Sequence, residues 1–187
     1  MKKKLSANFW LEEFTSLDWS ELDLQAQYML SNLASNILQP IRDVLGPIKV
    51  TSGVRTVKDY HNLVAKGYNP SETSDHFFGA PVILRSPKKI KKYGKRYTYS
   101  VGASDIVPVE VATYDAFKKV LSSWKTKKLK ISYGQIIYEK QGSKEWIHIS
   151  NPTSLIYSTE FIDKFLKKTP ILQSLDGGKT YTIPKDI

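Results

Sequence analysis

The chain has 187 residues, of which 41% are hydrophobic and 25% are charged; this length and composition suit a single globular domain over residues 1–187. It contains no cysteine, which excludes disulfides, thiolate catalysis and cysteine-ligated zinc, so any metal site must use His, Asp or Glu. The net charge of +10 fits either plain solubility or a polyanionic partner, and composition does not separate the two.

The sequence predicts neither a membrane span nor a secretion signal. No apolar run approaches the roughly 20 residues that a bilayer-spanning helix needs. The lysines at positions 2–4 begin like a signal peptide, but the apolar stretch of about 7–15 residues that should follow them is missing. We therefore expect the protein to be made in the cytoplasm without a Sec signal.

The first part of the chain predicts a long helical region followed by a strand. Apolar residues recur at helical spacing from about 22 to 45, and Pro40 inside this run predicts a kink or two abutting helices. A Gly-Pro pair ends the region. The alternating, β-branched residues 48–52 predict a strand, and a short helix is expected over 57–65.

The rest of the chain predicts strands mixed with helices. The predicted elements are a strand over 103–107, a helix over 111–124, strands over 135–139 and 146–150 joined by a turn at 140–144, a helix over 159–168 and a terminal hairpin over 172–183. Helices first and strands later predict an α+β fold, with a small antiparallel sheet flanked by helices.

Three separated residues are candidate metal ligands. His76 ends a polar loop, and His148 lies on a predicted strand. Asp105 lies in an apolar, strand-like segment, where an unpaired carboxylate is costly to bury and a bound cation would remove that cost. A catalytic zinc ion takes three such ligands and leaves one position for water, so we predict a Zn²⁺ site here. The alternatives are a loop-end cap for His76, a hydrogen-bonded sheet residue for His148 and a buried salt bridge for Asp105.

Glu145 is the candidate catalytic residue. Metal-assisted hydrolysis needs a carboxylate that accepts a proton from water and passes it to the leaving amine, and Glu145 precedes His148 by three residues. Residues three apart on a regular strand point to opposite faces of the sheet. The prediction therefore requires Glu145 to lie at a strand start or at a bulge.

Three segments match a known pattern in order. They are Ser74-Asp75-His76-Phe77-Phe78-Gly79, Ala103-Ser104-Asp105 and Glu145-Trp146-Ile147-His148. They resemble the zinc D-Ala-D-Ala carboxypeptidase family, particularly its branch with a C-terminal catalytic domain, whose pattern is Ser-x-His-x-x-Gly-x-Ala-x-Asp and then Glu-x-x-His. Segments 5–9, 38–42 and 51–55 also resemble the N-terminal half of that family. The likeness covers about residues 5–150.

This resemblance implies a Hedgehog/DD-peptidase-like fold and zinc-dependent hydrolysis of a peptide bond in bacterial peptidoglycan, by a D,D-carboxypeptidase or an endopeptidase. The family includes free bacterial enzymes and phage lysis or virion-associated proteins. Together with the missing signal peptide, it implies a phage-type or prophage-type lysis protein that acts at the cell wall or in a phage particle. The alternative is a non-catalytic phage tail or cell-wall-binding module on the same fold.

The resemblance also implies substrate-binding residues. Arg55 matches the family arginine that receives a substrate carboxylate, which a guanidinium holds with two parallel hydrogen bonds. Ser74 matches the motif serine, and Gln135 resembles a residue on a strand that lines the cleft. The alternatives are a surface or helix-capping arginine at position 55 and a simple loop serine at position 74.

One departure from the family is an apparent insertion at residues 80–101. The family has a short gap between the first His and the Asp, whereas positions 76 and 105 are separated by 29. Residues 97–101 alternate and predict the return strand of a hairpin. Six basic residues cluster at positions 88–96 of the insertion: Lys88, Lys89, Lys91, Lys92, Lys95 and Arg96. They fit either attraction of an anionic wall polymer or a solvated loop.

Nucleic acid is the third candidate partner, through the lysine clusters. Phosphate contacts would make such binding fall steeply with salt. The sequence shows no familiar nucleic-acid-binding motif, so we do not expect this function.

Overall fold

The computed structural model describes most of the chain. The described residues are 3–68, 70, 74–78, 81–83, 97–155 and 171–184. Two predicted features lie outside them: the six basic residues clustered at positions 88–96 and the helix expected over 159–168.

The long helical region near the N-terminus consists of two α-helices joined by a π-helical segment. Helix α1 (Leu24–Asn32) is capped by Asp23, whose carboxylate accepts a hydrogen bond from the backbone N–H of Ala26 in the first turn. A π-helical segment (Leu33–Leu38) leads into α2 (Gln39–Leu45), with Pro40 in its first turn. Proline has no N–H to donate, so the regular pattern of hydrogen bonds is interrupted just before it. The predicted helical region is confirmed, and the kink or helix break expected at Pro40 takes the form of a π-helical segment just before it, within one continuous helical run.

Five strands form the main sheet, in the order β1-β4-β6-β5-β7. They are β1 (Ile48–Ser52), β4 (Ala103–Pro108), β5 (Ile136–Gln141), β6 (Lys144–Ser150) and β7 (Ile171–Ser174). The first four pair in antiparallel fashion, whereas β7 runs parallel to β5. The expected α+β class is confirmed. The prediction of an antiparallel sheet is wrong at the β7 edge, where the pairing is parallel.

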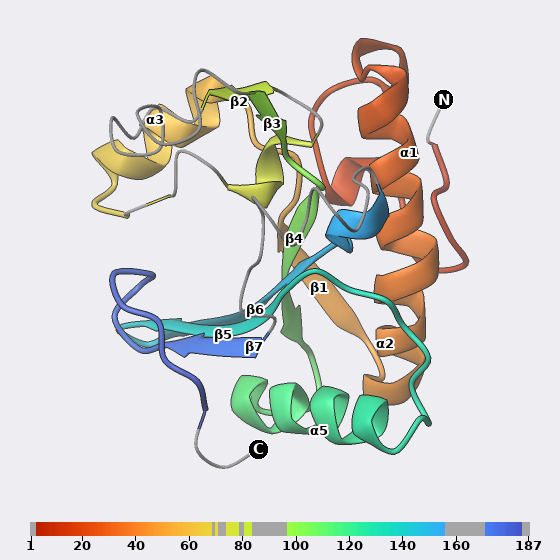
Figure 1. Ribbon diagram of the computed structural model, residues 1–187, viewed down its shortest axis with the longest axis vertical. Helices are drawn as coiled ribbons and strands as arrows, with labels where there is room; N and C mark the ends of the chain where they lie inside the picture. Colours follow the sequence, from red (N-terminus) through yellow and green to blue (C-terminus); the bar gives the residue numbers. More distant parts are fainter. Residues whose placement is uncertain are drawn as a thin grey trace.

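The hydrophobic core lies on one face of this sheet. Ile106, Ile147 and Ile149 are fully buried there, against α5 (Thr113–Lys125) and the helices α1 and α2. In Figure 1, α1 and α2 run in line beside the sheet and α5 crosses below it. Since successive side chains on a strand alternate between faces, the neighbours of these isoleucines point to the opposite face, where the candidate site lies.

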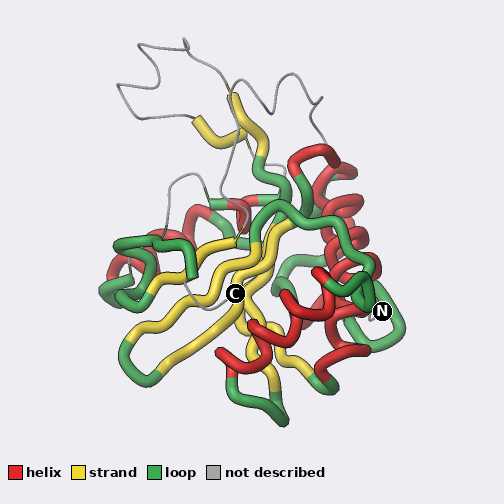
Figure 2. The backbone as a smooth tube through the Cα atoms, turned by 60° about the horizontal axis from the view of Figure 1, so that its bottom comes forward, coloured by secondary structure: helices red, strands yellow, loops and turns green. Residues whose placement is uncertain are grey.

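The insertion begins and ends in a second, two-stranded sheet. Strands β2 (Pro81–Ile83) and β3 (Tyr97–Tyr99) pair in antiparallel fashion, as the predicted return strand requires. They project from the main sheet (Figure 2). This pairing holds the two ends of the inserted segment together, so a long separation in sequence still allows residues 76 and 105 to meet.

One further helix, α3 (Val57–Ala65), follows β1. Thr56 and Asp59 cap its N-terminus reciprocally, which fixes the start of the predicted helix. No helix in the described part of the chain is both long enough and apolar enough to cross a bilayer.

Candidate metal centre

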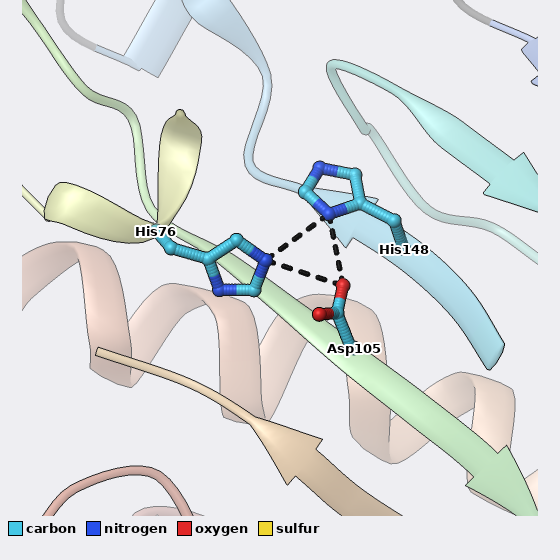
Figure 3. A group of neighbouring side chains, drawn as sticks. All are labelled: His76, Asp105 and His148. Atoms are coloured by element: carbon cyan, nitrogen blue, oxygen red, sulfur yellow. Dashed lines mark hydrogen bonds and ion pairs between the residues drawn. The ribbon is translucent and has the colours of Figure 1, made fainter. Parts of the chain in front are cut away.

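The three predicted ligands meet on the open face of the sheet. Asp105 on β4 and His148 on β6 are direct cross-strand partners, so the sheet register alone makes them neighbours. His76 reaches them from a single 3₁₀ turn, Asp75–Phe77. The side chains point toward one another (Figure 3). Asp105 Oδ1 lies 3.2 Å from His76 Nε2 and 3.0 Å from His148 Nδ1, and the two ring nitrogens are 3.2 Å apart.

The ring of His76 is held in one orientation by backbone groups. Its Nδ1 lies 2.8 Å from the carbonyl oxygen of Gly53, to which it donates, so Nε2 offers a lone pair to the other two ligands. The backbone N–H of Arg55 donates to the carbonyl of His76 at 2.8 Å. Position 53 must be glycine, because a Cβ there would stand 2.4 Å from the carbonyl oxygen of Phe14.

Burial and mutual charge shift the pKa values of the three candidate ligands. Burial raises the pKa of Asp105, but the charges and hydrogen bonds of His76 and His148 outweigh burial, so the net shift is downward. Burial lowers the pKa of His76 more than Asp105 raises it. The pKa of His148 is raised, because the hydrogen bond and charge of Asp105 exceed the effect of burial. These shifts favour the ionised form of Asp105, the neutral form of His76 and the protonated form of His148.

The donor geometry fits a zinc ion. Zinc–ligand distances of about 2.0–2.2 Å in a tetrahedron place neighbouring ligand atoms about 3.4 Å apart, close to the separations of 3.0–3.2 Å found here. Three donor atoms converge, while the ring proton of His76 is already used on Gly53. The group could therefore hold a metal ion.

The candidate ligands lie in an open cleft of about 790 Å³, a size typical of small-molecule and peptide sites. The three predicted substrate-binding residues, Arg55, Ser74 and Gln135, all line it. Nη1 of Arg55 donates to Oγ of Ser74 at 3.2 Å, and the same oxygen caps the turn that carries His76. The structure thus brings these residues to one cavity with the candidate ligands.

The structure does not bring the Glu145 carboxylate to the metal ligands. Glu145 is the second residue of β6, but the strand already pairs regularly there, with Glu145 opposite Lys140 and no bulge. Its side chain therefore follows the ordinary alternation and points to the face opposite His148. The carboxylate lies 2.8 Å from Nζ of Lys140 and forms a hydrogen bond with Tyr138. Tyr138 packs against Tyr114 of α5, so this pair lies on the helix-covered face even though position 145 borders the cleft.

Glu139 carries a carboxylate on the same face of the sheet as the candidate ligands. Ile137 pairs with His148, and Glu139 follows two residues later on β5, so its side chain points to the same face. Burial raises its pKa to about 7; His148 and Arg55 oppose this shift, while Asp105 adds to it. The sequence did not reveal this residue, because the predicted strands and the turn at 140–144 left the register of the two strands open; the structure pairs Glu139 with Trp146.

Comparison with known proteins gives no relative: no family model, no curated protein and no solved structure matches this chain. The family resemblance therefore rests on the motifs and their order. The meeting of three motif residues is an observation about this chain alone.

Proposed function

We propose that this protein is a zinc-dependent peptidase of the Hedgehog/DD-peptidase type that cleaves a peptide bond in bacterial peptidoglycan, as a D,D-carboxypeptidase or an endopeptidase. The observation that carries the proposal is the convergence of His76, Asp105 and His148 inside an open cleft. A zinc ion held there would polarise the scissile carbonyl and lower the pKa of a water molecule. A phage-type or prophage-type lysis protein acting at the cell wall or in a phage particle fits this chemistry.

Glu139 is the proposed general base in place of Glu145. It lies on the same face as His148, and the charges of His148, Asp105 and Arg55 all act on its carboxylate. A base that is half protonated near neutral pH can take a proton from water and return it to the leaving amine. Glu145, by contrast, is already paired with Lys140.

Arg55 is the proposed receptor for a substrate carboxylate. Burial lowers its pKa, and the carboxylates of Asp105, Glu139 and Asp59 oppose that shift. A guanidinium remains charged even so, and one of its donors is already oriented by Ser74. A peptide that ends in a carboxylate would therefore be held beside the metal ligands.

A matched pair of variants tests the proposal. Zinc-loaded wild-type protein should release peptide fragments from purified peptidoglycan, identified by mass, and a chelator should stop the release. Glu139→Gln should bind one zinc per chain and lose cleavage by roughly 10²–10⁴-fold, the usual contribution of a general base. Glu145→Gln, the control, should stay within about threefold of wild type, since its carboxylate serves a salt bridge.

Three outcomes contradict parts of this proposal. Loss of cleavage in Glu145→Gln with normal cleavage in Glu139→Gln would return the catalytic role to position 145. If purified wild-type protein incubated with zinc binds none, the proposed zinc site is contradicted. Zinc binding and sedimentation with cell walls, without any fragment released, would favour the non-catalytic wall-binding module.

A further inference from the structure

The end of the described chain forms a strap along β5, residues 171–184. After β7, the backbone turns back so that Gln173 and Thr182 exchange two hydrogen bonds of 2.8 and 2.9 Å. The turn is closed by Asp176, whose carboxylate accepts hydrogen bonds from the backbone of residues 179 and 180 and from a threonine hydroxyl. Gly177 donates to the carbonyl of Lys140 at 2.9 Å. The strap is therefore tied to the edge of the main sheet at several points.

This strap places a tyrosine hydroxyl beside Glu139. Oη of Tyr181 lies 3.5 Å from Oε1 of Glu139, longer than the roughly 2.5–3.0 Å of an ordinary O–H···O hydrogen bond, and a small side-chain movement would close the contact. The side chain of Tyr181 lines the cleft and is 46% exposed, so it remains open to a bound peptide.

Gly178 makes room for this contact. A Cβ at that position would stand 2.9 Å from the hydroxyl of Tyr181 and 3.8 Å from Oε2 of Glu139, and the φ angle of Gly178 is +83°. Both the space and the backbone conformation therefore favour glycine.

We propose that Tyr181 is a positioning residue of the active site: its hydroxyl donates to Oε1 of Glu139 and so directs Oε2 toward the water to be deprotonated. This inference rests on the proposed function through Glu139. Burial and the neighbouring Glu139 raise the pKa of Tyr181, so the phenol keeps its proton for donation. Donation to a carboxylate favours the ionised form that a base requires, against the burial that disfavours it.

The kinetic test removes only the hydroxyl. Tyr181→Phe should bind zinc as wild type does and keep KM for a peptidoglycan peptide within about twofold. Its kcat should fall by on the order of tenfold, the size expected for one hydrogen bond to a charged group. The matched control is Tyr28→Phe, an exposed tyrosine on α1 that does not line the cleft. Unchanged kcat in Tyr181→Phe, or a loss confined to KM, would overturn the positioning role.

A spectroscopic test does not depend on cleavage. In protein labelled with ¹³C at tyrosine Cζ, Tyr181→Phe assigns the Tyr181 resonance, and Glu139→Gln should shift that resonance in both metal-free and zinc-loaded samples. The Tyr28 resonance should not move. If the Tyr181 resonance has the same chemical shift in Glu139→Gln as in wild type, the contact between the two side chains is contradicted. If wild-type protein cleaves nothing but this shift is seen, the proposed function fails while the Tyr181–Glu139 contact stands.

Discussion

At the scale of single residues, the main feature of the candidate site is that its ligand atoms present lone pairs toward one another. His76 uses its ring proton on Gly53, so its Nε2 and the ionised Asp105 both present lone pairs toward His148. The hydrogen bond and charge of Asp105 raise the pKa of His148, which favours its protonated form. Because a histidine must be neutral to bind a metal ion, the metal affinity should weaken as the pH falls.

Glu139 gives a pH dependence that can be measured without metal. Its ordinary pKa is 4.5 and its folded pKa is about 7, so between these values the folded chain keeps a proton that the unfolded chain has released. Stability therefore falls as the pH rises through this window, by up to about 3 kcal/mol. Glu139→Gln removes this loss, and its free energy of unfolding should rise relative to wild type between pH 4.5 and 7.5.

Urea unfolding in chelator across this pH range measures the difference. Glu145→Gln is the control, because the pKa of Glu145 is lowered, chiefly by its hydrogen bond to Lys140. A lowered carboxyl pKa has the opposite sign, with stability lost as the pH falls. A difference between Glu139→Gln and wild type that stays constant with pH would contradict the shift.

At the scale of elements, most of the predicted segments are present. The helix over 57–65 matches α3, and the predicted strand and helix over 103–124 correspond to β4 and α5. Local periodicity and capping decide such segments, and both are visible in sequence. The predicted terminal hairpin is present, because Gln173 and Thr182 pair in antiparallel fashion, but only residues 171–174 form a strand. This strand also pairs with β5 in parallel, which was not predicted. The pairing with β5 depends on a strand that is distant in sequence, and the local residue pattern does not identify that strand.

Gly53 follows the end of β1 and its carbonyl oxygen accepts the hydrogen bond of His76, so a substitution there tests how the backbone positions a candidate ligand. Gly53→Ala must push a Cβ against the backbone of Phe14, at a cost of about 1–3 kcal/mol, and must move the carbonyl that orients His76. We expect lower stability and weaker zinc affinity, measured by urea unfolding and by competition with a chelator.

Gly142→Ala is the matched control for this test. A Cβ there meets nothing within 4 Å, although its φ of +61° is strained for alanine. It should lose about 1 kcal/mol of stability without any change in zinc affinity. Equal zinc affinity in the Gly53 and Gly142 variants would show that the carbonyl does not orient the ligand.

At the scale of the whole molecule, the basic cluster and the candidate metal ligands belong to different segments of the chain. The candidate ligands lie on the main sheet and an adjoining turn, whereas the six basic residues at positions 88–96 lie between β2 and β3 in sequence. We expect that replacing all six with glutamine leaves zinc content unchanged. Attachment to anionic cell walls should weaken and lose part of its salt dependence. Wall sedimentation at several salt concentrations measures this, and unchanged attachment would leave the insertion as a spacer.

The sequence by itself determined which residues could bind a metal, because cysteine was absent and only a few His and Asp residues lay in ordered motifs. It also determined most helices and strands, since their periodicity is local. Only the tertiary structure decided that Glu139 and not Glu145 faces the candidate ligands, and that Tyr181 lies beside it. The reason is geometric: the face that a side chain takes depends on strand register, and the partner of a terminal strap depends on packing across the chain.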